Sequence, residues 1–432
     1  MTHNKIFRSR HLLLLFLLFL FSCKKKDIIE EPVNGQPTTV RSVGQPLDET
    51  YFETVGAAGG TIQSPDGQIT IDIPAGALTQ DTEIGIQPIK NTAASGIGHS
   101  YRMTPHGKIF QKKVTVRFSY AKAERRISST KALEVAYQNE KGEWTCIGGS
   151  VNDRVQKTIS VQTDHFSDWA FVASMELSPV VKTVGLNESV TLKALRYLFP
   201  AKEDDFLVPL SLPEAGTGEP MLLEKRYIVG WSLNGPGKLE ARGNEAVYTA
   251  PSAKPANKTA TITVELNVHG TQVLLISTIH IIDEGIDISI DGGPWKMYAG
   301  MATKMPGLNK YSLGNLRLSA DLPQIVFMWP LTAGKKADGT YQWSMFSDDQ
   351  YNVVFEYATP DLSSLYASVY DEQLNSPVDS GGFISVEEKE ENGKKYLTGM
   401  FAVDQSGHYL TSTGEQIGVS SIVGTFKVQR SW

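Results

Sequence analysis

Apolar and polar residues alternate along most of the chain, which is the pattern of strands with one buried face. Clear runs are Ile69, Ile71 and Ile73, and then Val114, Val116, Phe118 and Tyr120. Turn sequences such as Pro65-Asp66-Gly67 separate these runs at short intervals, and no amphipathic helix of three turns follows residue 22. The pattern predicts an all-β fold of antiparallel β-sandwiches.

Changes in this pattern divide the 432 residues into five segments. We expect a signal peptide over residues 1–22, a lipidated tether over 23–49 and three β-sandwich domains in tandem over 50–173, 174–285 and 286–432. The tether is charged and rich in Pro, Gly and Thr without a sustained period, which is typical of a flexible linker.

The first segment joins basic residues to an apolar run of ten residues, Leu12 to Phe21. A membrane-spanning helix needs about 20 residues, so the run fits the core of a signal peptide instead. Leu20-Phe21-Ser22-Cys23 resembles a bacterial lipobox. The resemblance implies cleavage before Cys23 and acylation there by chains such as palmitate, and two or more chains anchor a protein stably in a membrane.

The residue after Cys23, the net charge and the second cysteine indicate the location of the protein, disfavour one class of partner and predict a buried side chain. The residue after Cys23 is Lys24, not an aspartate, and by the lipoprotein sorting rule this favours the outer membrane within the cell envelope. A net charge of −6, which becomes more negative once the basic signal peptide is removed, disfavours nucleic acid as a partner. The second cysteine, Cys146, lies in a strand-like segment, and we expect a buried side chain there.

No cofactor or transition-metal site is expected, because the histidines are isolated and no Cys-x-x-Cys pair exists. The acidic pairs in 202–206 and 346–352 lack the spacing of a known calcium loop, so solvated surface is the default reading, with calcium as the alternative. The chain has no Gly-x-Ser-x-Gly, P-loop or dinucleotide motif, which disfavours an enzyme acting on an external substrate.

The stretch from residue 50 to 173 carries the most specific resemblance. The segments "IDIPAGAL" (71–78) and "TPHGKIF" (104–110), after Gly59-Gly60, resemble the ZU-five domain of ankyrins and of uncoordinated-five netrin receptors. The resemblance implies a β-sandwich that serves as a scaffold. No ankyrin repeats or death domain accompany it, so the animal partners do not carry over.

In some ZU-five proteins a His-Phe-Ser tripeptide at the end of the domain cleaves itself, and His165-Phe166-Ser167 occupies that place here. The resemblance implies an N-to-O acyl shift in which Ser167 attacks the Phe166 carbonyl and His165 takes the hydroxyl proton. Asp164 would orient the imidazole or cap a turn. The alternative is purely structural: Phe166 in the core, Ser167 at a strand edge and His165 bonded locally.

The second domain resembles bacterial Ig-like modules without a disulfide, on the basis of Trp231 and Tyr248-Thr249-Ala250-Pro251. Its long connection from Tyr197 to Arg226 is the candidate binding insertion. The third domain resembles small C-terminal β-sandwiches of bacterial lipoproteins and contains two Gly-x-Phe steps, at 399–401 and 424–426.

These features together predict a lipid-anchored envelope protein that acts as a non-catalytic binding, adhesion or scaffold module toward a protein or polysaccharide. The alternative is a protein that cleaves its own Phe166–Ser167 bond. Aromatic rings stack on sugars, so the candidate polysaccharide-binding residues are Trp295, Trp329 and Trp343.

Overall fold

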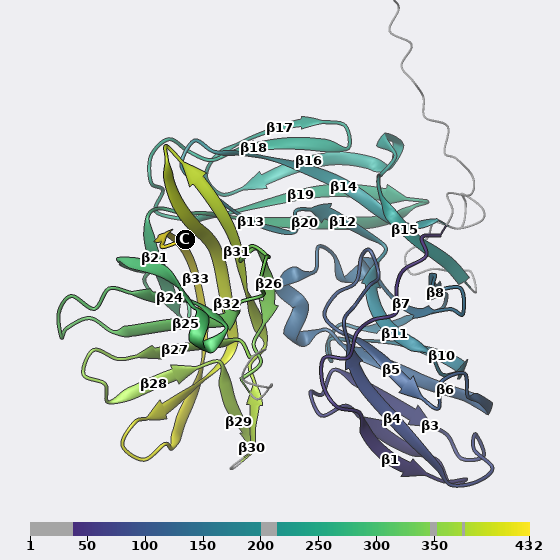
Figure 1. Cartoon of the computed structure of the whole chain (residues 1–432). Helices are drawn as coiled ribbons and strands as arrows, with labels where there is room; N and C mark the ends of the chain where they lie inside the picture. The colour runs from purple at the N-terminus through teal and green to yellow at the C-terminus, as the bar shows by residue number, and fades with distance from the viewer. Residues whose placement is uncertain (1–37, 200–213, 346–351, 374–375) are drawn as a thin grey trace, which may run out of the picture. The chain divides into compact units, whose positions relative to one another are not determined.

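The computed structural model describes residues 38–199, 214–345, 352–373 and 376–432. In these ranges nearly every element is a strand, which confirms the predicted all-β class (Figure 1). The helices among them are short 3-10 segments: η1 (Ala121–Arg126), η2 (Thr130–Ala132), η4 (Lys225–Tyr227) and η5 (Pro306–Leu308). No helix in the described part is long and apolar enough to cross a membrane.

The first module is a sandwich of two antiparallel sheets. One has the order β2 (Gly60–Gln63), β3 (Ile69–Ile73), β6 (Ile109–Ser119), β10 (Thr158–His165) and β9 (Val151–Asp153). The other begins with β1 (Tyr51–Val55), β4 (Thr82–Ile89), β5 (Ser100–Thr104), β11 (Asp168–Ala173), β7 (Leu133–Gln138) and β8 (Trp144–Ile147). The alternating isoleucines, valines and aromatics of both sheets form one buried core, as the period of two predicts.

The second sheet does not end at β8. Its edge pairs with β15 (Glu214–Leu222) through Glu214–Ile147, Ala215–Cys146 and Gly216–Thr145. Beyond β15 come β14 (Ser189–Phe199), β18 (Glu245–Thr249) and β17 (Lys238–Arg242), with β12 (Met175–Ser178) also on β14. The predicted boundary at 173/174 therefore falls between strands of one hydrogen-bonded sheet.

A four-stranded sheet covers this extension, in the order β13 (Val181–Val184), β20 (Thr271–Ile281), β19 (Thr259–Val268) and β16 (Ile228–Asn234). The core beneath it takes Trp144 and Cys146 from the first predicted domain, and Leu192, Tyr248 and Ile262 from the second. Apolar side chains from both sides of residue 173 thus share a single core.

The third module is one large sheet that pairs with itself. Its order is β22 (Lys296–Tyr298), β21 (Gly285–Ile290), β33 (Gln416–Arg430), β23 (Gly300–Met305), β24 (Lys310–Asn315), β25 (Gln324–Pro330), β27 (Val354–Ala358), β28 (Ser364–Ala367), β32 (Lys394–Leu410), β31 (Gly382–Glu391) and β26 (Gly339–Gln342). A separate pair is β29 (Val369–Gln373) with β30 (Ser376–Asp379).

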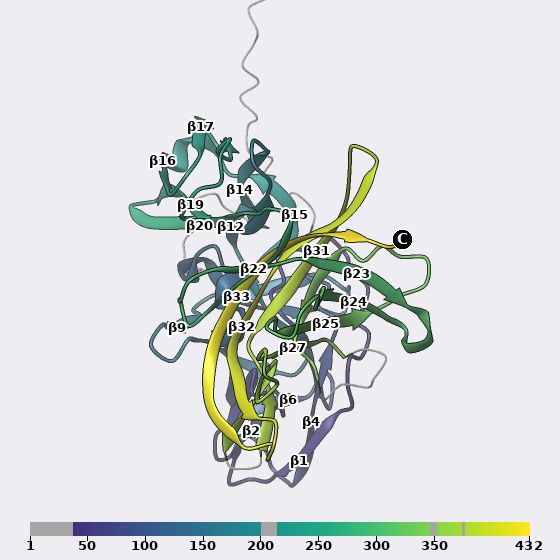
Figure 2. The ribbon, with the colours of Figure 1, turned by 90° about the vertical axis from the view of Figure 1, so that its left-hand side faces the viewer.

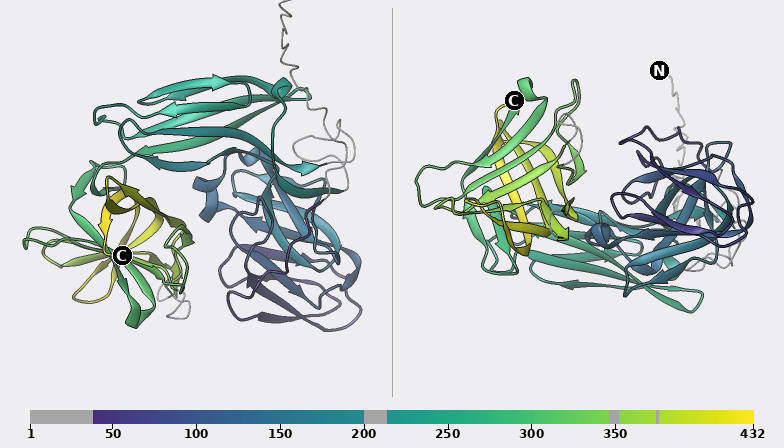
Figure 3. Two further views of the ribbon diagram at one scale, coloured as in Figure 1. Left: turned by 45° about the horizontal axis from the view of Figure 1, so that its top comes forward. Right: turned by 90° about the horizontal axis from the view of Figure 1, so that it is seen from below.

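The long hairpin of β32 and β33 closes this sheet, because β33 pairs with β23 as well as with β32 (Figures 2 and 3). Closure removes the exposed edges that an open sheet would present there. The enclosed core is strongly aromatic and includes Phe327, Trp329, Phe355, Phe401 and Phe426.

The two Gly-x-Phe steps of the sequence meet across this hairpin. Gly399 pairs with Phe426, and Phe401 pairs with Gly424. A Cβ atom added at Gly399 would collide with the Phe426 ring, and one added at Gly424 would collide with the Phe401 ring. Each glycine therefore leaves room for the phenylalanine of the opposite strand.

Candidate functional site

The His165-Phe166-Ser167 segment lies where the chain passes from one sheet of the first module to the other. β10 ends at His165 and β11 begins at Asp168, so Phe166 and Ser167 form the connection between them. Phe166 is 1 % exposed and Ser167 is 4 % exposed. The bond between these two residues is therefore inside the sandwich, away from bulk water.

Backbone hydrogen bonds hold this connection against the neighbouring turn. The Phe166 N–H donates to the Lys108 carbonyl at 3.0 Å, and the Gly107 N–H donates to the Phe166 carbonyl at 3.0 Å. The Phe166 ring packs edge-on against Phe110, with ring centroids 4.7 Å apart. The turn 104–110 thus fixes the carbonyl that a self-cleavage reaction would attack, and supplies one donor to its oxygen.

The Ser167 hydroxyl is already engaged. Its Oγ donates to the Gln138 carbonyl oxygen on β7 at 2.5 Å, and both groups are buried. A neutral amide oxygen is far too weak a base to remove the hydroxyl proton. In this arrangement Ser167 satisfies a buried backbone acceptor and is not activated as a nucleophile.

The His165 side chain contacts residues other than Ser167. Its Nδ1 lies 3.1 Å from Thr163 Oγ1 and 3.3 Å from Asp164 Oδ1. Its ring packs against Tyr137 and Trp169, at centroid distances of 4.7 and 5.7 Å. Within the described residues no hydrogen bond joins His165 to Ser167.

Tyr137, the aromatic neighbour of His165, stays a neutral phenol. Burial, followed by its hydrogen bond to the Glu214 carboxylate, raises the pKa of Tyr137 to about 12. The phenol donates to Glu214 Oε1 at 3.0 Å. His165, at the end of β10, is therefore held against two aromatic rings of the opposite sheet, on β7 and β11.

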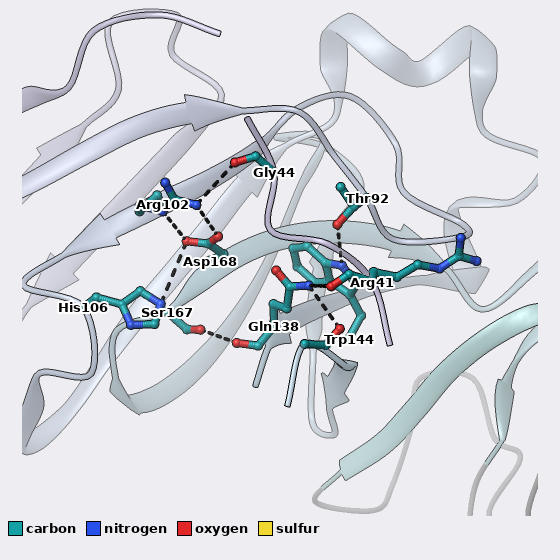
Figure 4. Close-up of polar contacts among 10 residues, drawn as sticks. Arg41, Gly44, Thr92, Arg102, His106, Gln138, Trp144, Ser167 and Asp168 are labelled. Carbon is teal, nitrogen blue, oxygen red and sulfur yellow. Dashed lines mark hydrogen bonds and ion pairs between the residues drawn. The ribbon is translucent and has the colours of Figure 1, made fainter. Parts of the chain in front are cut away.

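A second histidine, His106, lies close to the Phe166–Ser167 bond, and it was not among the site residues predicted from the sequence. His106 directly precedes Gly107, and its Nε2 is 4.0 Å from Asp168 Oδ1 (Figure 4). Asp168 also accepts two 2.9 Å hydrogen bonds from Arg102, and this contact raises the pKa of the arginine. The "TPHGKIF" segment was recognisable as a turn, but its contact with residue 168 depends on the fold.

The three predicted tryptophans are not equivalent. Trp329 is completely buried and stacks on Tyr311, and Trp343 is 4 % exposed with its Nε1 donating to the Ala402 carbonyl at 2.7 Å. Neither ring can stack on a sugar, because both fill the aromatic core. Trp295 is half-buried, with Lys258 Nζ 5.7 Å from its ring centroid.

Other predicted features either pack or lie outside the described ranges. Cys146 is buried, and burial raises the pKa of its thiol well above the usual value, so the group stays protonated and inert. In the described residues no three His, Cys, Asp or Glu side chains are grouped to hold a metal ion. Outside these residues lie Cys23, the signal peptide, the central part of the candidate insertion (200–213) and nearly all of both acidic stretches.

No protein-family model and no curated protein matches this chain. The resemblances to a ZU-five domain and to an Ig-like module therefore remain predictions from the sequence.

Proposed function

We propose that this chain is a lipid-anchored protein of the cell envelope whose β-modules act as non-catalytic binding, adhesion or scaffold units. The observation that carries the proposal is the state of Ser167. Its hydroxyl is buried and donates to the Gln138 carbonyl, while His165 is bonded to Thr163 and Asp164. The segment with the strongest sequence signal for chemistry is thus arranged as packing.

The anchor and the outer-membrane location rest on the sequence. A basic start, ten apolar residues and Ser22-Cys23 have the order of a lipoprotein leader. Acyl chains on Cys23 would hold the modules at a membrane surface, where a binding protein gains from many copies acting together.

The anchor is tested by expressing the full chain and its Cys23→Ser variant in a Gram-negative host supplied with radiolabelled palmitate. We expect label in the full chain and in the membrane fraction, and neither label nor membrane retention in the variant, because the serine oxygen is not acylated by the lipoprotein pathway. Equal labelling of both proteins, or none in either, would contradict the anchor. Separating inner from outer membranes by density then tests the predicted location.

Self-processing is the second candidate, and one observation favours it. The Gly107 N–H already points at the Phe166 carbonyl oxygen, at 3.0 Å, where an oxyanion would develop. In the reaction Ser167 Oγ would bond to the Phe166 carbonyl carbon, the C–N bond would break as nitrogen takes the proton, and water would hydrolyse the ester. The Ser167 hydroxyl would first have to leave Gln138.

This candidate is tested on a denaturing gel with the full chain and its Ser167→Ala variant. Because the hydroxyl is held by an amide oxygen, we expect both proteins to keep the Phe166–Ser167 bond. Two fragments that meet at this bond in the unaltered chain, and that are missing from the variant, would establish self-cleavage instead. A Gln138→Ala variant is the matched control, since it keeps the backbone acceptor of Ser167.

A further inference from the structure

In the described part of the chain no second sheet packs on the outer face of the five-stranded sheet in the first module, and the side chains there are mostly polar. On β10, Ile159, Val161 and Thr163 point into the core, so Ser160, Gln162 and Asp164 point outward. The register places matching outward residues side by side: Thr61 opposite Asp72, Asp72 opposite Thr115, and Thr115 opposite Gln162. Hydroxyl, carboxylate and amide groups therefore form a row across four strands.

This face is hollowed along the same row. One hollow of about 620 Å³ lies toward β9 and β10 and extends to Ile147 and Glu214 at the edge of the other sheet, and one of about 330 Å³ lies toward β2 and β3. Both are lined by Lys113, Thr115 and Gln162. The two hollows are thus parts of one depression, which we call the cross-strand groove and define by Asp72, Lys113, Thr115, Gln162, Asp164 and His165.

One side of the groove is rigid. Asp72 accepts a hydrogen bond from Thr61 Oγ1 at 2.8 Å and pairs with Arg117 at 2.9 Å. These contacts tie its carboxylate to the strands on both sides, so it cannot swing freely. A fixed carboxylate loses little entropy when its remaining lone pairs accept hydrogen bonds from a ligand.

The centre of the groove has unused hydrogen-bonding capacity. Within the described residues the side chains of Lys113, Thr115 and Gln162 form no hydrogen bond or ion pair. Together they offer ammonium, hydroxyl and amide donors and two kinds of neutral acceptor. A ligand with many hydroxyl groups, each both donor and acceptor, fits this set.

The charges of the groove narrow the ligand class. Arg117 pairs with Asp72, and Lys113 lines the groove together with the carboxylates of Asp164 and Glu214, so positive and negative groups are interleaved. An anionic polymer would meet these carboxylates, and a cationic one would meet Lys113. Electrostatic complementarity therefore favours an uncharged ligand.

We propose that the cross-strand groove binds an uncharged polysaccharide, laid across strands β2, β3, β6 and β10. Neighbouring strands are about 4.8 Å apart, so successive side chains of the row can contact successive sugar units. This inference rests on the proposed binding function and supplies its ligand class. It also moves the expected sugar contacts from the tryptophans of the third module to polar residues of the first.

The test is native gel electrophoresis of the full chain through gels that contain dextran, mannan, a soluble β-glucan or the anionic polygalacturonate. We expect retardation by at least one of the uncharged polymers. In the Thr115→Val, Gln162→Ala double variant the apparent affinity should fall at least tenfold, because two hydrogen bonds to the sugar are lost. Both positions are on the sheet surface, so the variant should unfold at the same temperature as the parent.

The matched control is the Thr191→Val, Gln324→Ala double variant, which makes the same two changes at exposed strand positions of the other modules. Its retardation should equal that of the parent. An equal loss in both variants, no loss in the groove variant, retardation by polygalacturonate alone, or no retardation by any polymer would overturn the proposal.

These outcomes are separable from a failure of the proposed function. If the Cys23→Ser variant still incorporates palmitate, while the Thr115→Val, Gln162→Ala variant loses polymer binding, then the anchor is refuted and the groove assignment stands. If palmitate labelling is lost with Cys23 but no polymer binds, the anchored module remains and the groove assignment falls.

Discussion

At the scale of single residues, two histidines with lowered pKa values should make the stability of the folded protein depend on pH. Burial lowers the pKa of His280 to about 4, with the positive charge of Arg125 as a second cause. Burial also lowers the pKa of His99, against the opposing effect of Asp66. Both side chains are therefore neutral in the folded protein at pH values where the unfolded chain would begin to protonate them.

The folded protein should lose stability as the pH falls from about 6.5 toward 4. In this window the unfolded chain binds protons that the folded chain excludes, so the free energy of unfolding rises with pH. For His280 alone the difference between pH 6.5 and pH 5 is about 2 kcal/mol. Urea unfolding at several pH values measures it.

His280→Gln is the matched variant for this prediction. Glutamine retains a polar group near Thr259 Oγ1, which lies 3.3 Å from His280 Nδ1, but cannot titrate. The slope of unfolding free energy against pH should become shallower in this variant. An unchanged slope would show that His280 does not control the acid response.

At the scale of elements, the closing hairpin of the third module depends on two small residues. Gly399 and Gly424 each lie under the phenylalanine of the opposite strand, and Phe401 and Phe426 are both completely buried. Glycine normally weakens a strand. Here the aromatic rings that cover the two glycines restore the packing that a side chain would have supplied.

Gly424→Ala should destabilise the protein by about 1 to 3 kcal/mol, because the new methyl group overlaps Phe401 and the closed core cannot expand. Thermal unfolding followed by tryptophan fluorescence measures the loss, since Trp329 and Trp343 report on this core. Gly418→Ala on the same strand is the control: nothing lies within 4 Å of its added Cβ. Equal effects of the two changes would contradict the steric explanation.

On the scale of the whole molecule, the described residues form three hydrophobic cores, and one of them takes side chains from both sides of residue 173. The third core falls within its predicted segment, with β21 beginning at Gly285. The first two cores are divided differently, because Trp144 and Cys146 belong to the core they share with residues after 173. Periodicity identifies a strand and its buried face, but not the sheet that the strand joins.

Because periodicity does not identify the neighbours of a strand, the sequence predicted local features but not contacts between distant segments. Alternation in 69–73 and 114–120 located real strands and the side chains that they bury. It could not show that Ser167 would reach Gln138, or that His106 would lie near Asp168, because these contacts join segments far apart in the chain. Trp329 and Trp343 failed as sugar-binding candidates for a related reason: large aromatic residues serve cores as readily as surfaces.

The pairing of β8 with β15 has a consequence for where the gene of this protein could be divided. A gene fragment ending after β11 would encode a sheet with a bare edge at β8 and only a minor part of the shared core. Such a product exposes strand edges and apolar surface, the conditions for aggregation. We therefore expect recombination between residues 173 and 174 to yield poorly folding products, so that the two segments it separates are kept together.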